Sequence, residues 1–269
     1  MRCCASVLNT RRRSRALKTK CKQGGECAKK PAEKESYIMI HIAIDGPSGA
    51  GKSSLAKGLA ARLGINYLDT GALYRTVGYA AHERGIRPDD RKAVAEMLGS
   101  VSVEAAFENG KQMMYLDGKP LGDAIRQHEI SSYASAVSAI PEVRAFLLET
   151  QRDVARRESV VMDGRDIGTV IMPDADIKIF LVASAEERAE RRRRELEERG
   201  ITESYEKILA DIRERDRRDS ERDIAPLRPA EDAIMLDNSG FTPEMSVDAA
   251  MRMIRERGIA TECGEDSVG

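Results

Sequence analysis

Tryptophan is absent from the 269-residue chain, which holds only 4 Phe and 7 Tyr. So few aromatic rings leave little surface on which nucleic-acid bases could stack. The net charge of −1 exerts no overall attraction on a polyanion. No apolar run approaches the roughly 18 residues that a membrane-spanning helix needs. We therefore expect neither nucleic-acid binding nor a membrane segment.

Cysteine is scarce outside the first part of the chain. Four of the five cysteines precede residue 28, and the fifth is Cys263. No disulfide framework can hold the rest of the chain together, and this usage is typical of a reducing compartment. We expect a cytoplasmic protein. The length allows one large domain or two small ones.

The first 36 residues differ in charge from the remainder. They carry 11 Lys and Arg against 3 Glu, a net charge of +8, whereas the remainder carries −9. They show almost no apolar periodicity, so burial cannot offset the entropy of ordering them. We expect residues 1–36 to be a disordered basic extension. Two origins remain open: an upstream sequence before a functional start at or near Met39, or an organelle transit peptide, which the Arg and Ser content resembles.

A glycine-rich loop follows the first predicted strand. Residues 38–44 form an almost continuous apolar run, which is typical of a central parallel strand buried on both faces. The next segment, GPSGAGKS at 46–53, fits GxxxxGK[ST] and is followed by helical spacing of leucines up to Leu63. The glycines allow a backbone nest whose amides hold phosphate oxygens. Lys52 would reach the β and γ phosphates, and Ser53 would offer a hydroxyl to Mg²⁺.

Strands and helices alternate in the remainder of the chain. Apolar segments at 160–162, 177–182 and 233–236 predict further strands, and helical patterns occur at 143–156, 185–198, 205–218 and 243–257. This alternation indicates an α/β fold with a parallel sheet. Residues 101–121 instead predict a small antiparallel meander inserted in the α/β core.

The residues near the second strand distinguish the classes of phosphate-binding proteins. A GTPase needs a guanine-reading NKxD motif, and the only comparable stretch is LDNS at 236–239. In an ATPase, the strand that carries the Walker B motif usually ends in two acidic residues. Here the strand predicted at 160–162 is followed by only one, Asp163, and then by Gly164 and Arg165. A kinase fits better, because it must exclude water and bind a second anionic substrate.

The helix predicted from Tyr205 changes character along one face. Ile208 and Ile212 share a face that steps of three and four continue through Arg215, Asp219 and Arg222. This charged continuation is either a surface ion-pair network or part of a site. Residues 188–223 hold 12 basic and 12 acidic side chains, so we interpret the arginines as local anion clamps rather than a nucleic-acid surface.

Three more motifs follow the glycine loop: DTGALYR at 69–75, DGRDIGT at 163–169 and ERDRRD at 214–219. With GPSGAGKS, they make residues 38–257 resemble the bacterial-type cytidylate kinases. The resemblance implies a P-loop three-layer α/β sandwich with a central parallel five-stranded sheet. It divides the chain into a kinase domain at 37–257, with a nucleoside-monophosphate-binding part at about 70–150, the meander at about 101–121 and a short helical lid at about 188–202, and a flexible tail at 258–269.

The resemblance also implies a reaction and its residues. The enzyme would transfer phosphate from ATP, with Mg²⁺, to CMP or dCMP in pyrimidine metabolism. We expect it to be a monomer. The residues that would bind ATP are Gly46, Pro47, Ser48, Gly49, Ala50, Gly51, Lys52, Ser53 and Ser54. Those that would bind the acceptor are Thr70, Arg75, Arg165 and Arg222 at the phosphate, Ser135, Arg144 and Asp166 at cytosine, and Arg215 and Asp219 at the ribose. The catalytic residues would be Lys52, Arg165, Arg191, Arg192 and Arg222.

The sequence departs from the family pattern at one place, and two other functions fit the residues. Lys52-Ser53-Ser54 stands where many relatives have Lys-Gly-Thr, so either Ser53 or Ser54 would contact the metal. A kinase for another small acceptor, including UMP or AMP, is the alternative enzyme. A nucleotide-dependent binding switch is the alternative outside enzymes.

Overall fold

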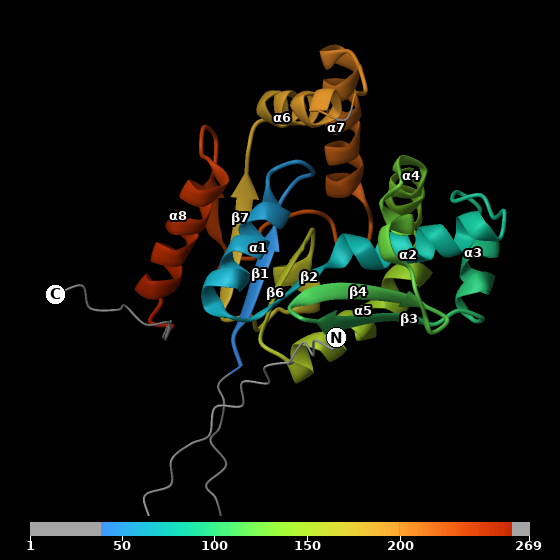
Figure 1. Cartoon of the computed structure of the whole chain (residues 1–269), viewed down its shortest axis with the longest axis horizontal. Helices are drawn as coiled ribbons and strands as arrows, with labels where there is room; N and C mark the ends of the chain where they lie inside the picture. The colour runs from blue at the N-terminus through green and yellow to red at the C-terminus, as the bar shows by residue number, and fades with distance from the viewer. Residues whose placement is uncertain (1–38, 199, 260–269) are drawn as a thin grey trace, which may run out of the picture. The chain divides into compact units, whose positions relative to one another are not determined.

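The computed structural model describes residues 39–198 and 200–259 (Figure 1). The basic extension predicted at 1–36 and residues 260–269 of the predicted tail lie outside these ranges. The elements in chain order are β1 His41–Asp45, α1 Lys52–Leu63, β2 Asn66–Asp69, α2 Thr70–Glu83, α3 Arg91–Leu98, β3 Val103–Glu108, β4 Lys111–Leu116, β5 Lys119–Pro120, η1 Gly122–Arg126, α4 His128–Val137, α5 Pro141–Arg157, β6 Val160–Gly164, η2 Ile167–Ile171, β7 Ile177–Val182, α6 Ala185–Glu198, α7 Tyr205–Glu221, β8 Ile234–Asp237 and α8 Pro243–Glu256.

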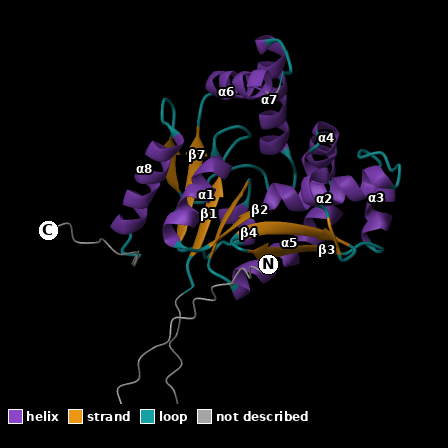
Figure 2. Ribbon diagram, in the orientation of Figure 1, coloured by secondary structure: helices purple, strands orange, loops and turns teal. Residues whose placement is uncertain are grey.

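Five parallel strands form the central sheet in the order β2-β6-β1-β7-β8 (Figures 1 and 2). Successive side chains of β1 point to opposite faces. Ile42 and Ile44 pack with α1 and α8, whereas Ala43 packs with α2 and α5. Two hydrophobic clusters therefore enclose the sheet, and the predicted three-layer α/β sandwich is confirmed.

The predicted meander is also confirmed. Strands β3, β4 and β5 pair antiparallel in a separate three-stranded sheet. Asn109-Gly110 and Asp117-Gly118 form its turns with φ between 51° and 73°, a conformation that matches the twist of the flanking strands. Met114 and Leu116 place one face of this sheet in the hydrophobic cluster of α2 and α5.

Helix α2 begins with no linker after β2. Asp69, the last residue of β2, is also the N-cap, and its carboxylate accepts the N–H of Ala72 at 3.2 Å. Further along α2, a Cβ on Gly78 would lie 3.0 Å from the backbone nitrogen of Ala134 and 3.1 Å from Cβ of Tyr133. The absence of a side chain at Gly78 is what lets α2 and α4 pack this closely.

Helices α6 and α7 lie between β7 and β8 in the chain. Helix α7 ends at Glu221, and Arg222 has extended backbone angles. The prediction that one helical face continues to Arg222 is therefore wrong. The helix stops because the N–H of Leu227 donates to the carbonyl of Asp219 at 2.8 Å and closes the helix end. Across the described ranges, no helix is both long and apolar enough to cross a membrane.

Candidate active site

The glycine-rich loop joins β1 to α1 at the carboxyl edge of the sheet. A Cβ on Gly46, where φ is +147°, would lie 2.3 Å from the carbonyl oxygen of Leu181, so only glycine fits beside β7. The buried Lys52 ammonium donates to the carbonyl of Pro47 at 2.7 Å. Burial lowers the pKa of Lys52 well below its ordinary value, and nearby Arg165 lowers it further. The loop thus holds a desolvated cation that an anion would stabilise.

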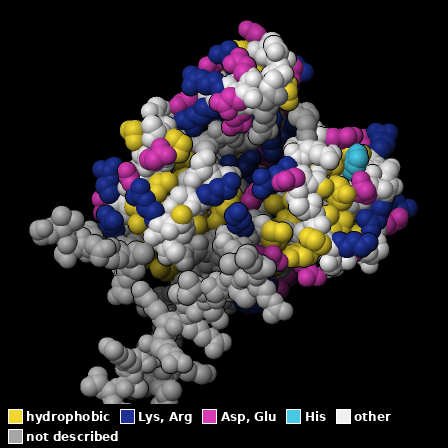
Figure 3. Space-filling view, viewed as in Figure 1, with side chains coloured by type: hydrophobic (Ala, Val, Ile, Leu, Met, Phe, Trp, Pro, Cys, Tyr) yellow, Lys and Arg dark blue, Asp and Glu magenta, His cyan; other side chains and the backbone are white. Residues whose placement is uncertain are grey.

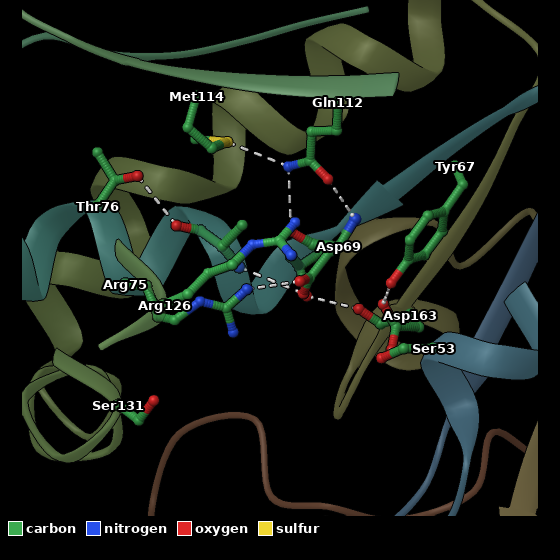
Figure 4. Close-up of polar contacts among 12 residues, drawn as sticks. Ser53, Tyr67, Asp69, Arg75, Thr76, Gln112, Met114, Arg126, Ser131 and Asp163 are labelled. Carbon is green, nitrogen blue, oxygen red and sulfur yellow. Dashed lines mark hydrogen bonds and ion pairs between the residues drawn. The ribbon is translucent and has the colours of Figure 1, made fainter. Parts of the chain in front are cut away.

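The carboxylate of Asp163, at the end of β6, accepts hydrogen bonds from two hydroxyl groups (Figure 4). Ser53 Oγ donates to its Oδ2 and Tyr67 Oη to its Oδ1, each at 2.9 Å. Burial raises the pKa of Asp163. A carboxylate beside a hydroxyl is the oxygen chemistry that Mg²⁺ accepts. Among the residues that the structure describes, no three His, Cys, Asp or Glu gather as a metal centre, so a cation here would need ligands from a nucleotide or water.

Two of the predicted acceptor residues are tied to the ends of neighbouring strands. Arg75 Nη2 donates to Asp69 Oδ2 at 2.6 Å. The buried hydroxyl of Thr70 donates to the carbonyl of Asp163 at 2.7 Å. Thr70 is therefore linked through Asp163 to Ser53 of the glycine-rich loop, and Arg75 is fixed at the end of β2.

A second group of predicted residues is buried around Asp166. Its carboxylate bonds the guanidinium of Arg144, and Arg222 Nη2 lies 3.6 Å from Oδ1. The guanidinium of Arg144 lies 5.7 Å from the ring centroid of Tyr74. Ser135 is linked to Arg144 only indirectly: Arg144 donates to the carbonyl of Ser138 at 3.3 Å, and the Ser138 hydroxyl donates to the carbonyl of Ser135 at 2.8 Å.

The two charged residues predicted on α7 differ in their partners. Asp219 Oδ2 accepts from Arg165 Nε at 2.7 Å. The side chain of Arg215 makes no hydrogen bond or ion pair with any residue in the described ranges. Burial lowers its pKa to about 10, and the charge of Arg165 adds to that effect. Arg215 is a half-buried cation beside another cation, an arrangement that favours a bound anion or polar ligand.

Helix α6 contacts the glycine-rich loop through two arginines. Arg188 is buried, donates to the carbonyl of Ser48 at 2.9 Å and forms a two-pronged ion pair with Asp216. Arg191 donates to the carbonyl of Ala50 in the loop at 3.4 Å and to the carbonyl of Asn238 at 3.1 Å. Arg192, by contrast, is half-exposed and pairs with Glu195 at 3.1 Å on its own helix. A cavity of about 440 Å³ adjoins this region and is lined by Gly49, Gly51, Lys52, Ser53, Ser54, Leu55, Arg191, Glu195, Asn238, Phe241, Pro243 and Ser246.

Comparison with known proteins identifies the family. The cytidylate kinase family model matches residues 42–256, which is most of the chain. The chain belongs to the cytidylate kinase family. It is 48% identical over 205 residues to the cytidylate kinase of Caldicellulosiruptor bescii, covering 76% of this chain and 91% of that protein. It is 48% identical over 216 residues to that of Fervidobacterium nodosum, covering 80% and 96%.

A solved structure is also similar, but more weakly. Shikimate kinase from Acinetobacter baumannii in complex with shikimate is 16% identical, with a TM-score of 0.39 over 81% of this chain and 93% of that chain. This likeness is too weak to support a conclusion about the site. The predicted family and the predicted enzyme class, a phosphotransferase, are confirmed by the family match and the relatives.

In Figure 3, Lys and Arg side chains surround the hollow between the pair α6 and α7 and the rest of the kinase domain.

Several residues that organise the site of this cytidylate kinase were not among the predicted site residues. They are Asp45, Asp69, Gln112, Asp163, Arg188 and Asn238. Asp45 and Asp163 each follow an apolar strand run, and that position is a usable signal for a site at the carboxyl edge of a parallel sheet. Arg188 and Gln112 carried no such signal, because their partners are distant in the sequence.

Asp45 joins the glycine-rich loop to the segment that follows β6. Its carboxylate accepts the N–H of Ile167 and the N–H of Gly168, each at 2.8 Å. Burial raises the pKa of Asp45 to about 6, although these two backbone donors act in the opposite direction. The last residue of β1 thus fixes the segment that follows Arg165 and Asp166 against the start of the glycine-rich loop.

Proposed function

We propose that this kinase transfers the γ-phosphoryl group of ATP to CMP and dCMP. The observation that carries the proposal is the buried pair of Arg144 and Asp166. Cytosine presents an amine donor and the N3 acceptor on one edge, so a carboxylate accepts from the amine and a guanidinium donates to the acceptors. Uracil presents a carbonyl and an N–H at these positions and leaves both partners unsatisfied.

Orphaned polar atoms support the proposed acceptor phosphate site. Nε of Arg75 and Nη2 of Arg222 are buried and have no hydrogen-bond partner among the described residues. Phosphate oxygens would satisfy them, because guanidinium groups bind phosphate through paired donors. Arg165 completes the proposed phosphate set with Thr70.

The proposed ribose site lies on α7. Arg215 has unused donors and Asp219 presents a carboxylate already oriented by Arg165. Together they offer a donor and an acceptor to sugar hydroxyl groups. Ser135 would complete the recognition of the base from α4.

The chemistry needs no covalent intermediate with the protein. Lys52 and the loop amides would hold the β and γ phosphates, and Arg165, Arg191, Arg192 and Arg222 would neutralise charge on the transferred group. Ser53 and Asp163 suit Mg²⁺, which would arrive with ATP and supply charge neutralisation at its phosphates. The hydrogen bond between them favours Ser53 over Ser54 as the metal contact. The remaining loop residues, Gly46 to Ser54, would surround the phosphates.

Helices α6 and α7 would exclude water from the transfer step. Arg191 already bonds the carbonyl of Ala50 in the loop, and Arg192 would have to leave Glu195 to reach ATP. We assign the nucleoside of ATP to the cavity beside Asn238 and Phe241. Exclusion of water matters because water competes with the acceptor for the activated phosphoryl group.

A panel of monophosphates tests the proposal. We expect ADP formation with CMP and dCMP to exceed that with UMP, AMP and GMP by at least about 100-fold in kcat/KM, because the mispaired base leaves buried groups unsatisfied. A preference for UMP or AMP would assign a different acceptor. Nucleotide binding with no transfer to any acceptor would favour a binding switch. We also propose a monomer that acts in the cytoplasm, and sedimentation of the purified chain tests the monomeric state.

A further inference from the structure

Gln112 of the meander pairs with the backbone of the central sheet's edge strand (Figure 4). Its Oε1 accepts the N–H of Asp69 at 2.8 Å, and its Nε2 donates to the carbonyl of the same residue at 3.2 Å. Nε2 also lies 3.1 Å from the sulfur of Met114, two residues further along β4. The side-chain amide therefore occupies both backbone groups of one residue, as a neighbouring strand would.

Asp69 connects the Gln112 side chain to the start of α2 and to Arg75. It is the last residue of β2, its carboxylate caps α2, and the same carboxylate binds Arg75 at 2.6 Å. That contact is the only ion pair of Arg75 within the described residues. A displacement of the Asp69 backbone would therefore move both the start of α2 and the guanidinium that it carries.

We infer that Gln112 is a positioning residue for Arg75 and that the inserted meander thereby sets the geometry of acceptor-phosphate binding. The inference rests on the phosphate-binding role proposed for Arg75. It explains why a polar side chain stands on β4 beside its cross-strand partner Phe107 and beside Met114, both of which contribute to a hydrophobic cluster. An apolar residue at this position would fill the same space and leave the two backbone groups of Asp69 without their partner.

A double-mutant cycle tests the coupling. We expect Gln112→Leu to raise the KM for CMP about tenfold, which corresponds to roughly one or two lost hydrogen bonds, with little change in the KM for ATP. In the background of Arg75→Ala the same substitution should leave the KM for CMP unchanged. Gln112→Glu keeps the acceptor for the Asp69 N–H but places a second acceptor against the Asp69 carbonyl, so it should also raise the KM for CMP. Gln127→Leu, at an exposed glutamine outside the site, is the matched control.

The outcomes separate a positioning role from a structural one. An equal change in both backgrounds, or an equal change in the KM for ATP and CMP, would overturn the inference. If Gln112→Leu does not fold, the same cycle with Gln112→Glu decides.

Hydrogen exchange supplies a readout that does not depend on the reaction. The Asp69 amide should exchange faster in Gln112→Leu than in the wild type, while amides of β7 and α8 keep their rates. Unchanged exchange at Asp69 would overturn the proposed anchor. If the monophosphate panel identifies an acceptor other than CMP, the cycle is run with that acceptor, so failure of the cytidylate assignment remains distinguishable from failure of the anchor.

Discussion

Ion pairs in this kinase occupy two different environments, the exposed sides of α6 and α7 and the buried site. On the exposed side, Arg217 pairs with Glu214 and Glu221, which are three and four residues away. In the site, Arg144 pairs with Asp166, and Arg165 pairs with Asp219 54 residues further along the chain. Local exposed pairs contribute little because water screens them. Pairs between distant residues in the buried site cost free energy because their charges lose water. We propose that contacts with the substrates offset this cost.

The largest expected effect concerns the buried cation of the loop. We expect Lys52→Met to lower kcat by at least about 100-fold while leaving the fold intact, because a donor aimed at developing phosphoryl charge is lost. Steady-state ADP formation measures it, and circular dichroism checks the fold. Lys92→Met is the control, since Lys92 is an exposed lysine paired with Glu96 on α3. Comparable turnover in both variants would remove the contrast between the two environments.

The next effect separates base recognition from phosphate recognition. We expect Asp166→Ala to lower kcat/KM for CMP by about 100-fold and for UMP by less than about tenfold, because only cytosine offers an amine to the carboxylate. Arg75→Ala should lower both values by similar factors, since the phosphate is common to both substrates. Competition assays with the two nucleotides measure the selectivity ratio directly. An unchanged ratio in Asp166→Ala would show that the pair with Arg144 is structural.

Asp45 provides a pH test of burial. Its pKa of about 6 in the folded chain is above the ordinary value of 3.8, so the folded state binds the proton more tightly. The stability that this proton contributes is present at low pH and is lost as the pH rises through 6. We expect the unfolding free energy of the wild type, minus that of Asp45→Asn, to fall by about 1 kcal/mol between pH 5 and pH 7. Urea unfolding at several pH values measures it, and a constant difference would contradict a raised pKa.

The smallest effect is expected on the exposed side. Arg217→Ala removes two ion pairs at once, yet we expect the melting temperature and kcat to stay within experimental error of the wild type. Differential scanning calorimetry and the coupled assay provide the two measurements. A marked loss of activity would show that the outer side of α7 takes part in function.

Features that depend on residues close together in the sequence were predicted, whereas features that depend on distant residues were not. The glycine loop, the buried strands and the meander depend on local periodicity and turn residues, and they were predicted with nearly correct bounds. Strand β2 was not recognised from its pattern, because Asn66–Asp69 is only four residues long and runs directly into α2. The family resemblance supplied the fifth strand.

The site was less accessible to prediction than the fold. Motifs located Arg75, Arg165 and Asp166, but no motif shows that Gln112 bonds a backbone 43 residues away. The prediction that the charged face of α7 continues to Arg222 was wrong, because the bond that closes the helix end comes from Leu227, beyond the helical repeat. Contacts of this kind arise only when distant segments fold together.

The close packing at Gly78 has a consequence for the length of the acceptor. Helix α2 carries Arg75, which we assign to the phosphate, and α4 carries Ser135, which we assign to the base. A methyl group on Gly78 would meet Ala134 and Tyr133 at about 3 Å, tighter than ordinary contacts, and would force the helices apart by some tenths of an ångström. The residue at position 78 therefore sets the distance between the helix with the proposed phosphate contact and the helix with the proposed base contact, and that distance selects the length of the acceptor.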